Sequence, residues 1–186
     1  EWGGASIALP MLYWLHYGDI SLAREYYEPM KRYINYLASQ DSAYILKMGL
    51  GDWYDYGPGR AGFSQNTPLP LVATAHYYQW MCYMYVLAKQ LGHKDEANSF
   101  NQRAEDIRQA FNREFYDAKR KIYGTGSQCS LALPLYLKLV PEKDFDAVLQ
   151  NLVKDIHRHG DRLTTGDVGN RYLFYTLAQN GHRELL

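Results

Sequence analysis

The sequence predicts an all-α protein built from helical hairpins arranged in series. Apolar residues recur at helical spacing in seven segments, and no segment shows sustained alternation of apolar and polar residues. Glycine or proline stands near the ends of most of these segments. Because short and long connections alternate, we expect the first six helices to pair as three hairpins, each packed against its neighbours.

The first hairpin is expected from helices at residues 5–17 and 21–38. Gly18 ends the first helical pattern, and Ser21 is a candidate N-cap for the second helix. A long connection, residues 39–67, follows. Its clustered glycines and prolines predict a loop, in which only short strands are expected.

The later helices are predicted in the same way. The second hairpin is expected from helices at residues 69–91 and 95–115, with Gly92 ending the first of them. A short strand is allowed near Tyr123. The remaining three helices are expected at residues 127–139, 142–159 and 167–179, with Pro141, Gly160 and Asn180-Gly181 at their ends.

The composition excludes several classes of protein. The 186 residues include 20 Lys and Arg against 20 Asp and Glu, so the net charge is near zero. No basic tract interleaves with aromatic residues, so no nucleic-acid partner is expected. The longest apolar run, residues 80–88, is too short to cross a membrane. Cys82 and Cys129 stand in apolar helical context, which favours free buried thiols.

The length fits one domain. An odd number of helices, and a start in the loop Glu1-Trp2-Gly3-Gly4, suggest that both ends cut through a larger helical array. We therefore expect residues 1–186 to be a single partial domain, truncated at both ends.

The most informative loop is Gly51-Asp52-Trp53-Tyr54-Asp55-Tyr56-Gly57-Pro58-Gly59, which places acids beside aromatic rings. Sugars offer C–H faces for stacking on rings and hydroxyl groups for carboxylates, so a carbohydrate is the expected ligand. The alternative is structural: the aromatic residues would cover one end of a core, and Asp52 would cap a turn.

Four loops precede odd-numbered helices, and in an up-down array these helix starts point the same way. The rim so formed, together with the aromatic loop, gathers the candidate substrate-binding residues Trp2, Asp52, Trp53, Asp55, Tyr56, Gln128, Thr165 and Asp167. Asp167 and Ser127 have a structural alternative as N-caps.

Glycoside hydrolysis needs one carboxyl group to protonate the leaving oxygen and a second to activate water or attack the sugar. Glu1, beside the ring of Trp2, is the candidate general acid. The six histidines are scattered, and no nucleophile elbow, phosphate loop or dinucleotide fingerprint occurs. We expect neither a metal nor a cofactor.

Short motifs occur along the whole chain in a characteristic order. They are Glu1-Trp2-Gly3, Leu9-Pro10, Tyr17-Gly18-Asp19, Gly51-Asp52-Trp53, Thr67-Pro68, Thr74-Ala75, Tyr77-Tyr78, Ser127-Gln128, Leu139-Val140-Pro141, Leu163-Thr164-Thr165-Gly166, Val168-Gly169 and Tyr172-Leu173. Each motif is weak alone, but in their order and spacing they resemble the catalytic domain of bacterial α-L-rhamnosidases.

The resemblance implies part of an α/α toroid of six helical hairpins with a sugar pocket on one face. It implies inverting hydrolysis of terminal α-L-rhamnose from polysaccharides or glycosides, without a metal, and contacts from Asp52 and Trp53 to the sugar. It also slightly favours a periplasmic or secreted location.

The sequence departs from the family pattern at the expected acids. Gly4 stands where many members have Asp, and Asp167 replaces a commonly apolar residue. The general base is expected beyond Leu186, so we expect the 186-residue chain to be inactive alone and to need the remainder of its catalytic domain. The alternatives are another α/α-toroid glycosidase, a polysaccharide lyase, or a non-catalytic scaffold that binds sugar or protein.

Overall fold

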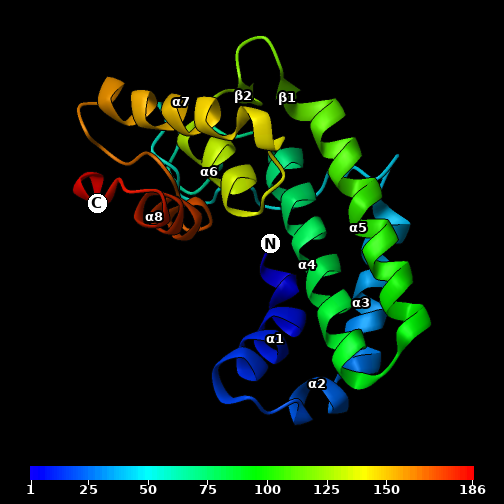
Figure 1. Ribbon diagram of the computed structural model, residues 1–186. Coiled ribbons are helices and arrows are strands. Elements are labelled where there is room, and N and C mark those ends of the chain that lie inside the picture. Colours follow the sequence, from blue (N-terminus) through cyan, green and yellow to red (C-terminus); the bar gives the residue numbers. More distant parts are fainter.

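A computed structural model describes residues 1–186, and the predicted all-α class is confirmed (Figure 1). The elements in chain order are η1 (Trp2–Gly4), α1 (Ala5–Tyr17), α2 (Ser21–Glu25), α3 (Tyr27–Gln40), α4 (Leu69–Leu91), α5 (Lys94–Phe115), β1 (Tyr116–Asp117), β2 (Ile122–Tyr123), α6 (Gln128–Tyr136), η2 (Glu142–Asp144), α7 (Phe145–Arg158), α8 (Gly169–Gln179) and η3 (Arg183–Leu185). No helix is both long and apolar enough to span a bilayer.

Helices α1 and α4 have the bounds that the sequence predicts. Each ends at a glycine in the left-handed region, Gly18 with φ 69° and Gly92 with φ 86°. The short antiparallel pair of β1 and β2 matches the strand allowed near Tyr123. The pairing of α4 with α5 as a hairpin is also confirmed, since the two helices pack side by side along their lengths (Figure 1).

The predicted helix at residues 21–38 is wrong as a single element. The structure has two helices that meet at Tyr26, where the backbone leaves helical geometry (φ −100°, ψ 13°). Pro29 explains the break, because it has no N–H for the carbonyl of Glu25 and its ring would collide with that carbonyl. In the first turn of α3, Pro29 needs no such partner.

The later helices are shorter than the sequence predicts. Helix α6 ends at Tyr136, and α7 is preceded by the 3-10 turn η2. Ser127 is confirmed as an N-cap, since its side chain accepts a bond from Ser130 N. The N-cap alternative for Asp167 is wrong, because α8 begins at Gly169 with Val168 in the cap position.

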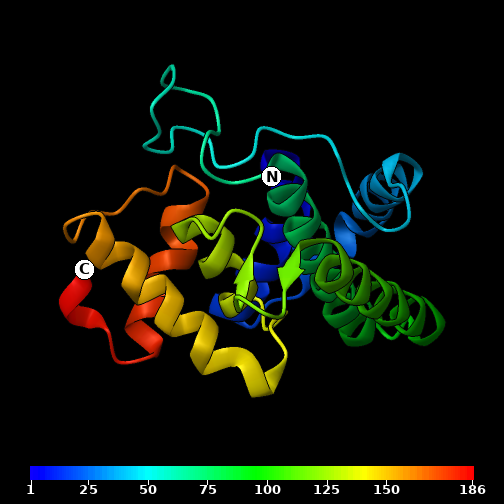
Figure 2. The same cartoon turned by 90° about the horizontal axis from the view of Figure 1, so that it is seen from above.

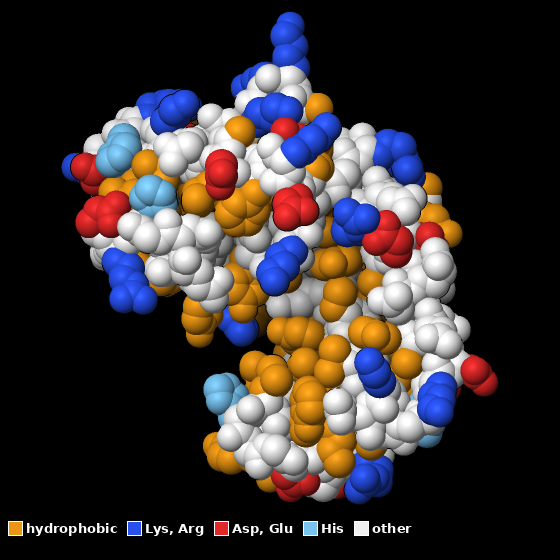
Figure 3. Space-filling view, in the orientation of Figure 1, with side chains coloured by type: hydrophobic (Ala, Val, Ile, Leu, Met, Phe, Trp, Pro, Cys, Tyr) orange, Lys and Arg blue, Asp and Glu red, His pale blue; other side chains and the backbone are white.

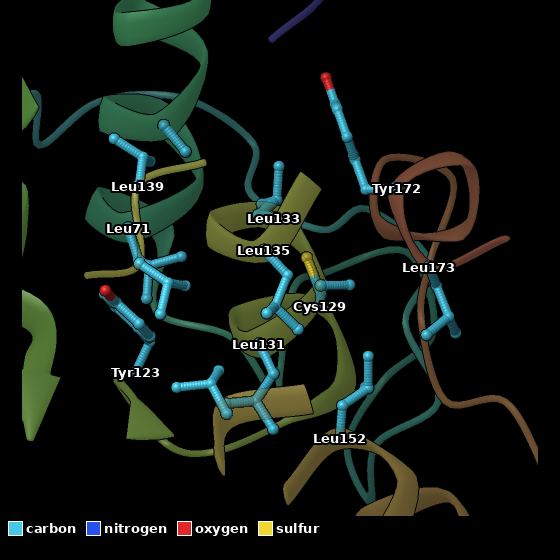
Figure 4. Packing of buried hydrophobic residues seen from close by; sticks show 14 of the residues in the cluster. Leu71, Tyr123, Cys129, Leu131, Leu133, Leu135, Leu139, Leu152, Tyr172 and Leu173 are labelled. Atoms are coloured by element: carbon cyan, nitrogen blue, oxygen red, sulfur yellow. The ribbon is translucent and has the colours of Figure 1, made fainter. Parts of the chain in front are cut away.

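The core has two parts, and α4 contributes to both. One cluster of 18 buried residues joins α1, α2, α3 and α5 to α4 between Ala73 and Ala88, while a cluster of 21 joins α6, α7 and α8 to the first turns of α4. In the second cluster the side chains of α6, including Leu131 and Cys129, lie between Tyr123 of β2 and Leu173 of α8 (Figure 4). Helix α4 is therefore the common support of both halves.

One side of the molecule is open. A hollow separates the half containing α8 from α1 and α2, and hydrophobic side chains gather on its α1 and α2 wall (Figure 3). An apolar groove of about 340 Å³ lies between α1, α2 and the start of α3, and the exposed side chains of Leu9 and Tyr26 line it.

The long connection from α3 to α4 crosses the end of the molecule that carries the N-terminus. It passes beside the N-terminal residue and reaches the segment before α8 (Figure 2). The predicted gathering of loops at one rim therefore occurs for the first residues, the 51–59 loop and the segment before α8.

Candidate functional site

Asp52 joins two loops that are far apart in sequence, the acidic loop (residues 51–59) and the glycine loop (residues 163–169). Its Oδ2 accepts a hydrogen bond from Gly166 N at 2.9 Å, and its Oδ1 accepts one from Gly169 N at 2.7 Å. The residue is 0% exposed. Burial raises the pKa of this carboxyl, and the two backbone N–H groups oppose that rise.

Two glycines let the loops approach this closely. A Cβ on Gly166 would lie 2.1 Å from Trp53 O, and one on Gly169 would lie 2.8 Å from Asp52 Oδ2. Backbone bonds complete the contact: Asp167 N donates to Trp53 O at 2.8 Å, and Tyr56 N donates to Thr164 O at 3.0 Å. These bonds tie the segment before α8 to the acidic loop.

The other buried polar candidates also hold the chain together. Asp55 accepts bonds from Gln65 N and Asn66 N, and Thr165 Oγ1 donates to Asn170 Oδ1 at 2.6 Å. Gln128 spans the base of the glycine loop: its Nε2 donates to Arg162 O at 3.0 Å and its Oε1 accepts from Thr164 N at 2.8 Å.

Direct sugar contact by Asp52 or Gln128 does not fit this geometry. Neither residue exposes surface, and both have their side-chain atoms bonded to the backbone. We therefore reassign both as residues that position the loops. The sequence suggested sugar contact by Asp52 because it precedes Trp53. The same pair of residues occurs whether the carboxylate faces a ligand or a backbone amide.

Glu1, Trp2 and Asp167 meet at a cavity of about 220 Å³, which we call the Glu1 pocket. Its other walls come from α1, α4 and α8, with His76, Trp80, Val168, Arg171, Tyr172 and two alanines. Trp2 is 57% exposed, and Asp167 is also exposed. Carboxylates, an arginine and indole rings thus line one hollow, which offers a ligand both stacking surfaces and charge-assisted hydrogen bonds.

The carboxylate of Glu1 is held in place by the acidic loop and the residue before it. Its Oε2 accepts from Leu50 N at 3.1 Å and its Oε1 accepts from Gly51 N at 3.0 Å. To act as an acid, Glu1 would carry its proton on one of these oxygens. The two backbone bonds fix the position of the Glu1 carboxylate. The assignment of Glu1 as general acid stays a prediction.

A second cavity, of about 310 Å³, shares Glu1 and Trp2 with the first and extends toward Tyr36 and Leu50. A third, of about 440 Å³, which we call the Tyr56 pocket, lies between the acidic loop and the glycine loop and shares Asp167 with the Glu1 pocket. Asp167 therefore stands between two neighbouring hollows.

The aromatic residues of the acidic loop differ in their surroundings. The Trp53 ring packs against Tyr54 and Phe63, with centroids 5.9 Å and 5.6 Å away. Tyr56 lines the Tyr56 pocket and is largely exposed. Their role in sugar binding stays a prediction.

His76 is a wall residue of the Glu1 pocket that sequence reasoning missed. Its Nδ1 lies 2.8 Å from Val72 O, and its Nε2 lies 3.0 Å from the hydroxyl of Tyr172, which donates to Gln79 Oε1 at 2.8 Å. Burial lowers the pKa of His76 to about 4, so the ring is neutral near pH 7. The only signal in the sequence was the position of His76 four residues before Trp80, which puts both on one helix face. That spacing is equally typical of two core residues.

We expect the stability of the protein to fall as the pH drops from 6.5 to about 4. In that window the unfolded chain binds a proton at His76 and the folded chain does not, so stability decreases toward acid pH by up to about 3 kcal/mol. Thermal unfolding of wild type and His76→Gln across this window measures the effect. The variant should lose much of the decrease, whereas His16→Gln, at an exposed position on α1, should retain it. Parallel curves for wild type and His76→Gln would contradict the expectation.

Comparison with known proteins identifies the domain that contains this site. The family model described as the bacterial alpha-L-rhamnosidase 6 hairpin glycosidase domain matches residues 1–186. The chain belongs to this family. The predicted helical hairpins are therefore part of a six-hairpin toroid.

Individual relatives agree with this family assignment. An alpha-L-rhamnosidase of Formosa agariphila is 30% identical over 196 residues, covering 100% of this chain and 20% of the relative. The structure of alpha-L-rhamnosidase from Dictyoglumus thermophilum matches with a TM-score of 0.84 and 33% identity, covering 91% of this chain and 19% of that one.

The Streptomyces avermitilis alpha-L-rhamnosidase in complex with L-rhamnose matches with a TM-score of 0.88 and 24% identity over 98% of this chain and 17% of that one, which supports the fold. The chain thus spans about a fifth of the length of these three relatives.

Proposed function

We propose that this chain forms part of the catalytic domain of a glycoside hydrolase that removes terminal α-L-rhamnose from polysaccharides or glycosides with inversion. The relatives above are alpha-L-rhamnosidases. The observation that carries the proposal is the Glu1 pocket, where carboxylates from opposite ends of the chain converge beside the ring of Trp2.

In this proposal the indole of Trp2 stacks on one face of the sugar ring, and Arg171 and Asp167 bond its hydroxyl groups. Glu1 protonates the leaving oxygen. The general base comes from the remainder of the catalytic domain, which also covers the open side of the chain. In an inverting enzyme the two carboxyl groups are about 6.5–9.5 Å apart, which leaves room for a water.

The proposal is tested with the intact protein that carries this chain. Hydrolysis of a methyl α-L-rhamnoside should release L-rhamnose, and proton NMR should detect the β-anomer first, before mutarotation. Release of the α-anomer first would contradict inversion. No turnover of any α-L-rhamnoside, while another glycoside is cleaved, would contradict the substrate.

We expect Trp2→Ala to raise KM for a rhamnoside about tenfold, because the variant removes an exposed stacking surface worth roughly 1.4 kcal/mol. Tyr17→Ala is the matched control: Tyr17 is an exposed aromatic residue at the far end of α1. Steady-state kinetics separate KM from kcat. Equal KM values for wild type and Trp2→Ala would show that Trp2 makes no contact with the sugar.

A further inference from the structure

A polar pocket of about 270 Å³ lies away from the Glu1 pocket, and we call it the α7 pocket. Its walls come from the turn between β1 and β2, the start of α6, the last turns of α7 and the two loop residues Asn66 and Thr164. The β1–β2 hairpin stands beside α7 in Figure 1, and Asn151 Nδ2 of α7 donates to Lys121 O of the turn at 2.8 Å. Its size is close to the lower end of the range for ligand sites, about 300 Å³.

Asp155, on the wall of the α7 pocket, has a buried oxygen without a hydrogen-bond partner. The residue is 6% exposed, and its Oδ2 is the buried side-chain atom that lacks a donor. The nearby Nδ1 of His159 is 3.3 Å from Oδ2 but lies closer, at 2.8 Å, to the backbone oxygen of Asp155. Since buried acceptors are nearly always satisfied, this oxygen indicates a place for a ligand O–H or N–H group.

The charges around the pocket favour a ligand that is also an anion. Two arginines, Arg120 and Arg158, line the pocket together with one carboxylate, Asp155. Arg158 lies 3.4 Å from Oδ1 of Asp155, whereas the guanidinium of Arg120 takes part in none of the ion pairs of the molecule. A planar guanidinium without a partner is suited to bind a carboxylate through two parallel bonds.

We propose that the α7 pocket binds an acidic sugar residue. A ring hydroxyl donates to Oδ2 of Asp155, and the sugar carboxylate accepts from Arg120. Thr164 lines this pocket and Thr165 lines the Tyr56 pocket, so the two hollows border the same glycine loop. The proposal rests on the proposed function only in taking the ligand as a unit of a glycan substrate.

The experiment is calorimetric titration of the intact protein with methyl β-D-glucuronide, methyl β-D-glucoside and inorganic sulfate. We expect saturable binding of the glucuronide and at least about tenfold weaker binding of the neutral glucoside. Arg120→Ala should weaken glucuronide binding about tenfold, and Asp155→Asn should also weaken it. Lys119→Ala, which removes the same charge from the same exposed turn, should bind as wild type.

Three results would overturn the proposal. Absence of saturable glucuronide binding would mean that water alone fills the pocket. Sulfate binding as tight as that of the glucuronide and unaffected by Asp155→Asn would mean a simple anion site. Equal affinity of wild type and Arg120→Ala would place the ligand elsewhere. Rhamnoside turnover, measured on the same preparations, reports separately on the proposed function.

Discussion

Glu1→Gln is expected to lower kcat of the intact protein on a methyl α-L-rhamnoside by about 10²–10⁴, the usual contribution of a positioned general acid. Glutamine preserves the size of the side chain, and its oxygen can still accept one of the two N–H bonds from Leu50 and Gly51. The expected loss therefore reflects the missing proton rather than a collapsed loop.

The choice of leaving group separates the two roles of Glu1. A 4-nitrophenolate departs with little help from an acid, so Glu1→Gln should lose much less activity on 4-nitrophenyl α-L-rhamnoside than on the methyl glycoside. Glu184→Gln, an exposed position near the C-terminal end, serves as the control. Equal losses on both substrates would show that Glu1 positions the acidic loop and does not protonate the leaving oxygen.

Asp52→Ala is expected to release the glycine loop from the acidic loop. Two buried amides, Gly166 N and Gly169 N, would lose their acceptor, at a cost on the order of 4 kcal/mol if each loses about 2. The measurement is amide hydrogen exchange of residues 163–169 in the intact protein, which is local and needs no two-state unfolding.

Asp52→Asn provides a graded comparison, because its amide retains one acceptor oxygen. We expect exchange in the glycine loop to be fastest in the alanine variant and intermediate in the asparagine variant. Wild-type protection in Asp52→Ala would show that the glycine bonds do not hold the loop, and would reopen a direct role of Asp52 in ligand binding.

The helices were predictable where local signals agree with packing. Gly18 and Gly92 mark the ends of α1 and α4, since left-handed backbone at a helix end favours glycine wherever the helix packs. Pro29 also indicates the break at Tyr26. The sequence pattern nevertheless predicts one helix, because apolar residues continue at helical spacing across the break. The start of α8 was not predictable, because Val168 stands at its N-cap position and its side chain makes no capping bond.

The site was predictable as a set of loops but not residue by residue. The up-down order of helices placed Glu1, the acidic loop and the glycine loop at one rim, and the structure brings them together. Which side chains face the hollow depended on contacts made across the chain. Asp52 and Gln128 are turned inward to backbone amides and carbonyls, whereas His76 lines the pocket from the middle of a core helix.

The sequence by itself determined the all-α class, the bounds of α1 and α4, and the rim that carries the carboxylates and aromatic rings, because periodicity and helix-ending residues act over a few positions. Only the tertiary structure decided which carboxylates face the cavity and which hold loops together. The reason is physical: a carboxylate bonds a sugar hydroxyl and a backbone N–H equally well, and the partner that Asp52 meets lies 114 residues away.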